Sequence, residues 1–278
     1  MDRLRSQRRT EQGPALVQRL FRGTNALELS KQVRQQRQGD ILPAAACGAN
    51  ASETDAALTY GEVVPSSFVA IMNSIRAPLT KVRGCSNSSG SGGLVFYDLG
   101  CGQGKACFAA LLEPNCYFRK IVGIEIMGEL VAIALKVKAK LLLAMEMAEG
   151  MSGGETETTT SYAVTACLAS PRVAGILPLR YDMDLNFKVG DIFEVNDEHP
   201  IDSDWCEAAD VFYCANLLFS EGMIHALSRK VVGMKAGAVF ISLRQLDEDI
   251  TAGRAVLLEE SFYKMSWHYA SVFVYLIL

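Results

Sequence analysis

Apolar and polar positions follow two different patterns along the chain, and the change comes at about residue 58. Residues 1–58 show no sustained period, because an Arg- and Gln-rich stretch leads into a run of small residues. From residue 59 onwards, short apolar runs alternate with longer amphipathic stretches. This pattern predicts a basic, partly flexible N-terminal extension over 1–58 and one folded domain over 59–278.

The apolar runs within the predicted domain have the length of β-strands. Five of them lie at 94–99, 120–125, 185–193, 209–216 and 235–243. Amphipathic stretches of helical length separate several of these runs, and they lie at 104–113, 128–149 and 220–234. A further helix is predicted over 66–75, where one helical face carries Phe68, Ile71, Met72 and Ile75. Strands joined through helices need crossover connections, so these strands are expected to run mostly parallel.

The end of the chain departs from this alternation. Residues 261–278 read as two strands with a turn near His268 and no helix between them. Strands joined by a tight turn pair in antiparallel fashion. The sequence therefore predicts an α/β fold with a mostly parallel, seven-stranded, Rossmann-like sheet and an antiparallel last strand, which is the layout of class I methyltransferases.

A glycine-rich loop, YDLGCGQGK at 97–105, connects the first predicted strand to the helix that follows it. Asp98 stands at the strand end, and Gly100, Gly102 and Gly104 let the backbone turn tightly and approach a ligand. A helix N-terminus in this position presents free N–H groups to a carboxylate or a phosphate. The spacing is DxGxGxG, which is typical of S-adenosylmethionine sites. Dinucleotide sites have GxGxxG, so an NAD-dependent oxidoreductase is disfavoured.

Two carboxylates end the next two predicted strands, at the edge where open α/β sheets bind ligands. Glu125 ends the second strand and can accept hydrogen bonds from both ribose hydroxyls. Asp191 ends the third strand and can accept from the adenine amino group, while Ile192 packs on the ring. Each acid by itself could instead cap the following helix. Together with the glycine loop, the two acids favour an S-adenosylmethionine site.

Charge is distributed unevenly, although the net charge is only −4. Residues 1–40 hold nine Lys and Arg against four Asp and Glu, and between Asp182 and Asp210 ten acids accompany one lysine. The basic arm could contact phosphate, serve as a nuclear address or stay solvated, and the acidic stretch would suit a basic protein substrate. The eight cysteines lack metal-ligand spacing, so no metal is expected, and no apolar run reaches the roughly 20 residues of a membrane span.

Six motifs, taken in order, resemble one enzyme family. They are TYGEVVPSSF, YDLGCGQGK, IVGIE, VGDIF, FYCANLLFSE and KMSWHYASVFVY, and they extend over 59–278. In the combination of Tyr60, Gly61 and Glu62 with an Asn after the fourth strand, the chain is similar to the non-SET histone-lysine methyltransferases of the disruptor-of-telomeric-silencing (Dot) family. The resemblance implies S-adenosylmethionine-dependent methylation of a lysine in the core of histone three, presented on a nucleosome in the nucleus.

On the cofactor side, the resemblance implies that the segment with Tyr60 and Glu62 folds over the methionine end of S-adenosylmethionine. Asp98 and the loop glycines would hold that end. Lys105 stands where the family has Gln, and it would contact the carboxylate of the cofactor. Without the resemblance, the Tyr-Gly-Glu triplet reads as a tight turn whose acid caps the helix over 66–75.

On the acceptor side, the resemblance places Asn216 between cofactor and acceptor, with Phe219 and Trp267 lining the lysine channel. By residue type alone, the phenylalanine could be ordinary core and the tryptophan a hairpin anchor. A channel tyrosine of the family falls nearest to Val274, one place before Tyr275. A shift of one residue turns a side chain to the other face of a strand.

Nucleosomes or core histones are thus the expected substrate, with a weak DNA contact through the basic arm. Its candidate arginines are Arg3, Arg5, Arg8, Arg9, Arg19 and Arg22. Two alternatives stay open at this stage. The first is a methyltransferase for a non-histone acceptor, and the second is a non-catalytic module that binds S-adenosylmethionine.

Overall fold

One mixed sheet forms the centre of the protein. The computed structural model describes residues 13–24, 28, 29, 32, 62–83, 93–112, 118–150, 184–193 and 205–278. Seven strands form the sheet in the order β3-β2-β1-β4-β5-β7-β6. Their bounds are β1 Leu94–Leu99, β2 Phe118–Glu125, β3 Asp184–Val189, β4 Val211–Cys214, β5 Val239–Ser242, β6 Ala255–Lys264 and β7 Tyr269–Ile277. Strand β7 runs in the opposite direction to the other six strands. The predicted fold is therefore confirmed.

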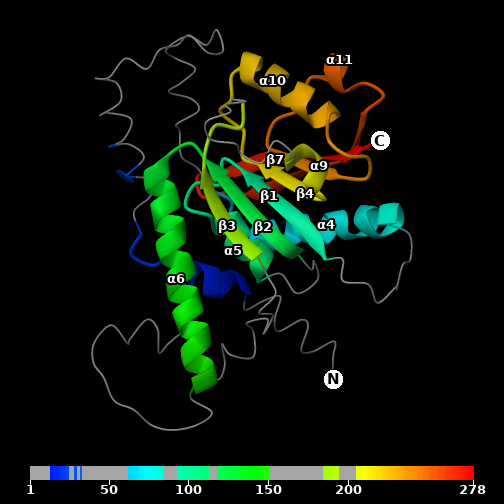
Figure 1. Cartoon of the computed structure of the whole chain (residues 1–278). Helices are drawn as coiled ribbons and strands as arrows, with labels where there is room; N and C mark the ends of the chain where they lie inside the picture. Colours follow the sequence, from blue (N-terminus) through cyan, green and yellow to red (C-terminus); the bar gives the residue numbers. More distant parts are fainter. Residues whose placement is uncertain are drawn as a thin grey trace.

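Helices cover both faces of the sheet (Figure 1). They are α4 Pro65–Arg83, α5 Lys105–Leu111, α6 Gly128–Gly150, α9 Trp205–Ala208, α10 Glu221–Val232 and α11 Glu248–Thr251. One buried apolar cluster joins α4, α5 and α6 to the first face of the sheet, and a second joins α10 to the opposite face. None of the helices in the described ranges combines the length and apolar composition of a membrane span.

Two elements extend further than the sequence pattern predicts. Helix α4 continues past residue 75 and through Pro78, because Leu79 prolongs the buried face by one more turn. Strand β6 begins at Ala255 rather than at 261. Its first half is largely exposed and contains an irregular register after Leu257, so it lacks the regular alternation that marks a half-buried strand.

The N-terminal extension is not wholly peripheral, which corrects the expectation for 1–58. A helix over 13–20 packs on the first face of the sheet, and Leu16, Val17, Leu20 and Phe21 are all buried there. Their spacing places them on one side of a helix. The apolar stripe is short and interrupted by Gln and Arg. The pattern therefore did not predict a helix in this segment of basic composition.

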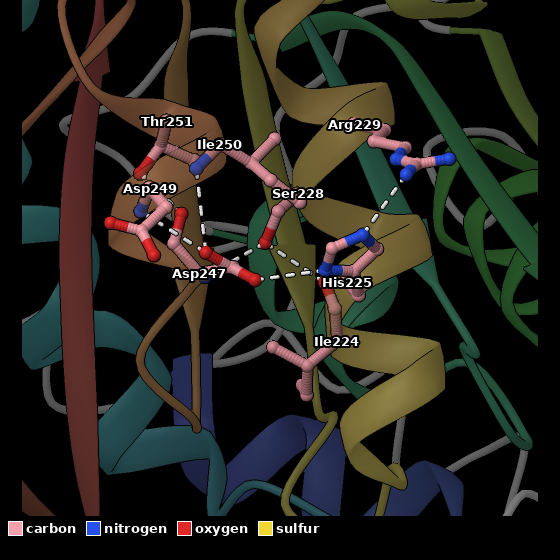
Figure 2. A network of polar contacts seen from close by, with 8 residues as sticks. All are labelled: Ile224, His225, Ser228, Arg229, Asp247, Asp249, Ile250 and Thr251. Carbon is pink, nitrogen blue, oxygen red and sulfur yellow. Dashed lines mark hydrogen bonds and ion pairs between the residues drawn. The ribbon is translucent and has the colours of Figure 1, made fainter.

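A polar network fixes the connection between α10 and α11 (Figure 2). Asp247 caps α11, and its Oδ1 accepts from the backbone N–H groups of Asp249 and Ile250 at 3.1 and 3.3 Å. Its Oδ2 lies 2.9 Å from Nδ1 of His225, and this hydrogen bond is the main reason why the pKa of the acid is lowered. Ser228 Oγ accepts from the Asp247 N–H at 2.9 Å. The network therefore holds the chain that follows β5 against α10.

Truncating Leu20 is expected to destabilise the whole domain. The Leu20→Ala variant should lose about 2–4 kcal/mol of unfolding free energy, because it opens a cavity in the main core. Urea denaturation followed by circular dichroism measures this loss. The matched control is Arg19→Ala, which changes an exposed neighbour and should stay within about 0.5 kcal/mol of wild type. Equal stability of both variants would contradict the placement of the helix in the core.

Candidate cofactor and acceptor site

A cavity of about 710 Å³ lies at the carboxyl ends of the parallel strands. Its walls come from the glycine loop after β1, the ends of β2 and β3, the segment after β4 and the turn between β6 and β7. Open α/β sheets bind ligands at this edge, and small-molecule sites have volumes in this range. The cavity is therefore the candidate functional site.

Glu125 fixes the conformation of the glycine loop through hydrogen bonds to the backbone. Gly100 and Gly102 adopt positive φ angles of 78° and 56°, which other residues rarely adopt. One carboxylate oxygen of Glu125 accepts from the Gly102 N–H at 2.8 Å, and the other accepts from the Met127 N–H at 2.9 Å. A carboxylate oxygen can accept more than one hydrogen bond. The acid thus orders the loop from within the cavity wall.

The far end of the cavity combines a carboxylate with apolar walls. Asp191 lies beyond the end of β3, and its Oδ1 accepts from the Phe193 N–H at 2.8 Å. Ile192 and Ile126 line the cavity beside it. A flat heteroaromatic ring fits between such aliphatic side chains, with the carboxylate at its edge to accept from an amino group.

Glu62, the one described residue of the Tyr-Gly-Glu triplet, lies in the same site as the glycine loop. Its side chain accepts from Gln103 Nε2 at 2.7 Å and forms an ion pair with Lys105. Burial raises the pKa of Glu62, and the neighbouring Lys105 opposes this rise. The backbone of Glu62 bonds Ser266 in the β6–β7 turn twice, since its O accepts from the Ser266 N–H at 2.8 Å and its N–H donates to Ser266 Oγ at 3.1 Å. The acid connects three segments rather than capping α4.

Asp98 is the most deeply buried carboxyl of the cavity, with 2 % of its surface exposed. Burial raises its pKa to about 8, and the negative charges of Glu125 and Glu62 contribute to the rise. Sγ of Cys107 lies 3.6 Å from its Oδ2, and this hydrogen bond opposes the rise. A buried acid of this kind favours either its own proton or a cationic ligand.

Asn216 is fully buried and acts first as a structural residue. Its Oδ1 accepts from the N–H groups of Leu243 and Arg244 at 2.8 and 3.2 Å and from Ser242 Oγ at 3.0 Å. These bonds join the end of β4 to the end of β5. Asn216 itself is absent from the cavity wall, but the residues on both sides of it line the cavity.

Aromatic side chains line the part of the cavity that lies after β4 and at the β6–β7 turn. Phe219 and Trp267 both line it, and the ring of Phe219 lies edge-on to that of Phe193 with centroids 5.8 Å apart. Trp267 is 43 % exposed and stands at the mouth. Tyr275 faces the opposite side of the sheet, where its hydroxyl accepts from the Leu246 N–H at 3.0 Å. It therefore does not act as the channel tyrosine that the family resemblance implies.

The structure brings most of the predicted site residues to one cavity. Those that line it are Glu62, Asp98, Gly100, Gly102, Lys105, Glu125, Asp191, Ile192, Phe219 and Trp267. Gly104 does not line it: a Cβ there would lie 2.5 Å from the Phe187 ring, so this glycine serves packing rather than ligand contact. Tyr60 lies outside the described residues.

Several residues of the cavity wall were not singled out from the sequence. They are Thr24, Gln103, Ile126, Met127, Tyr213 and Met223. Ile126 directly follows Glu125, the acid at the end of β2, and this position could have predicted that it lines the cavity. Thr24 carries no sequence signal, because only the packing of helix 13–20 brings it to the site.

Comparison with known proteins defines the fold. No family model matches the chain, and no curated protein matches its sequence. Among solved structures, the rRNA methyltransferase AviRa from Streptomyces viridochromogenes is 17 % identical over 85 % of this chain and 94 % of its own, with a TM-score of 0.51. A putative RNA methyltransferase from Pyrococcus horikoshii is 11 % identical over 80 % of this chain and 89 % of its own, with a TM-score of 0.44. The magnesium protoporphyrin IX methyltransferase of Synechocystis is 12 % identical over 96 % of this chain and 97 % of its own, with a TM-score of 0.42. The chain has the fold of class I methyltransferases.

The residues that line the cavity fit S-adenosylmethionine. Glu125 and Asp191 are carboxylates of the kind that accept from ribose hydroxyls and from an adenine amino group, and Ile192 offers an apolar wall. At the other end, Lys105 can pair with a methionine carboxylate, and Asp98 is a buried acid whose ionised form an ammonium group would favour.

The raised pKa of Asp98 predicts a specific pH dependence of stability. The folded protein binds the proton more tightly than the unfolded chain, so stability falls as the pH rises through the interval between the unfolded value and about 8. Relative to Asp98→Asn, wild type should lose about 4 kcal/mol of unfolding free energy between pH 5 and pH 9. Urea denaturation at several pH values measures the difference. Asp184→Asn, at an exposed acid in β3, should keep the wild-type slope, and an unchanged slope in Asp98→Asn would contradict the prediction.

Proposed function

We propose that the protein is an S-adenosylmethionine-dependent protein-lysine N-methyltransferase that acts on a core lysine of histone three in nucleosomes. One observation carries the proposal: cofactor-type acids and an aromatic wall line the same cavity. Glu62 joins the two halves, because it contacts the glycine loop with its side chain and the Trp267 turn with its backbone. The sequence resemblance to the Dot family supports the choice of a histone lysine.

The cofactor half of the cavity positions the reacting carbon. When bound, S-adenosylmethionine supplies an electrophilic methyl group on a positively charged sulfur. Glu125 and Asp191 fix the nucleoside end, and Asp98 with Lys105 fixes the amino-acid end. Residues that held both ends would restrict the orientations open to the methyl group. In-line alignment of this kind supplies a large part of the rate enhancement in bimolecular transfers.

The acceptor half of the cavity selects an uncharged amine. A lysine attacks only as the neutral amine, and apolar surroundings disfavour its ammonium form. Leu218, Phe219 and Trp267 provide such surroundings. Neither His225 nor His268 lines the cavity, so no described histidine is placed to take the proton. We assign proton loss to solvent at the mouth, where Trp267 is 43 % exposed.

A methyl acceptor other than a histone is the second candidate. The position of Tyr275 favours it, because Tyr275 faces the opposite side of the sheet and does not serve as the channel tyrosine of the histone-directed family. AviRa, whose fold is similar, is an rRNA methyltransferase. RNA and non-histone proteins therefore belong in the same experiment.

Methyl transfer from radiolabelled S-adenosylmethionine tests the proposal. Nucleosomes, free core histones, total RNA and cell extract are the acceptors, and label on nucleosomal histone three is the expected result. Trp267→Ala should lower this label about tenfold or more, because it removes one wall of the acceptor site. Asn216→Asp should lower it too while keeping the oxygen that accepts from Leu243. Leu142→Ser, on an exposed part of α6, is the matched control and should retain activity.

The outcomes separate the candidates. Label on RNA or on another protein, with none on nucleosomes, would overturn the histone assignment and keep the enzyme class. Binding of S-adenosylhomocysteine without any label would indicate a non-catalytic module. Absence of binding would overturn the whole proposal.

A weak DNA contact through the basic arm, and with it a nuclear location, forms part of the proposal. Arg19 is exposed on the helix that packs against the core and Arg22 is exposed in the turn that follows it, while the earlier arginines precede the described residues. Removal of residues 1–12, combined with Arg19→Gln and Arg22→Gln, keeps the buried helix. This variant should bind nucleosomes more weakly and with a smaller salt dependence, because fewer phosphates are neutralised. Filter binding at several salt concentrations measures both, and an unchanged salt slope would remove the contact.

A further inference from the structure

Tyr213 lies next to Asp98 in the wall of the cavity. The two residues are Cα partners in the parallel ladder between β4 and β1, so their side chains leave the same face of the sheet. Both line the cavity, and each has 2 % of its surface exposed. The charge of Asp98 contributes to the raised pKa of Tyr213, after burial itself, as expected for close neighbours.

Two buried polar atoms of the cavity wall have no hydrogen-bond partner among the described residues. They are the hydroxyl oxygen of Tyr213 and Oε1 of Gln103. The amide of Gln103 is oriented by Glu62, because a carboxylate accepts only from the Nε2 side. Buried polar groups are almost always satisfied in proteins, so two unpaired oxygens in one cavity point to a ligand group that pairs with them.

The chemistry of the cluster specifies that ligand group. Asp98 has one polar contact among the described residues, the weak thiol contact of Cys107. A carboxylate, an amide oxygen and a hydroxyl can all accept, so together they suit a group with several N–H donors and a positive charge. Lys105 also lines the cavity and carries the charge that a carboxylate needs. An amino-acid zwitterion matches both charges.

We propose that Tyr213 and Gln103 act together with Asp98 as the binding site for the α-ammonium group of the cofactor, and that Tyr213 determines specificity for its amino-acid end. This inference rests on the proposed function. The inference goes beyond the proposed function because it assigns a role to Tyr213 and Gln103, which do not belong to the Asp and Gly positions of the DxGxGxG motif.

Isothermal titration with two ligands tests the assignment. The first is S-adenosylhomocysteine, and the second is its deaminated analogue, which lacks only the ammonium group. Tyr213→Phe should bind S-adenosylhomocysteine about tenfold more weakly than wild type, because one hydrogen bond to a charged group is lost. It should bind the analogue as wild type does. Gln103→Met, which removes the unpaired oxygen at similar volume, should give the same pattern.

Tyr97→Phe is the matched control. It also removes a buried tyrosine hydroxyl from the centre of the sheet, but Tyr97 packs in the cluster on the opposite face and does not line the cavity. Its affinities for both ligands should equal those of wild type. Thermal unfolding of every variant, and binding of the analogue, show that the variants are folded.

Each outcome decides the matter. Unchanged affinity of Tyr213→Phe for S-adenosylhomocysteine would overturn the assignment, and so would an equal loss for both ligands. A loss in Tyr97→Phe would show that the effect comes from the sheet and not from the ammonium. If wild type binds neither ligand, the proposed function fails, whereas binding by wild type with no selective loss defeats this inference alone.

Discussion

The site depends on one half-buried acid that links three separate segments. Glu62 accepts from Gln103 and pairs with Lys105 on the glycine loop, and its backbone bonds Ser266 in the last hairpin. These contacts join sequence positions more than 200 apart. Because the side chain contacts the glycine loop and the backbone contacts the hairpin, this one residue links two walls of the cavity.

Unbalanced negative charge is the second constraint on the cavity. Glu62, Asp98 and Glu125 all lie in its wall, and burial raises the pKa of the first two. Lys105 compensates part of this charge. A ligand with positive charges on its sulfur and ammonium groups offsets the remaining negative charge. The burial of these acids, which costs folding free energy when they are ionised, therefore favours a cationic cofactor.

The strands and the acids that follow them into the cavity could be predicted because their signals are local. Short apolar runs define the parallel strands, and the topology rule places their carboxyl ends at one edge, so Glu125 and Asp191 were found together. Helix 13–20 was not predicted, because four apolar residues among Gln and Arg have the composition of a solvated tail. Tyr213 and Thr24 escaped for a different reason, since nothing in their neighbouring residues tells which side chains border a cavity.

The sequence by itself determined the order of the elements, the glycine loop and the acids that end the strands, because periodicity and turn chemistry depend on neighbours within a few residues. The tertiary structure alone decided that Glu62 pairs with Lys105, that Asn216 ties β4 to β5, and that Tyr275 faces away from the site. Long-range pairing and strand register set these contacts, and a shift of one residue would reverse the side that each side chain faces.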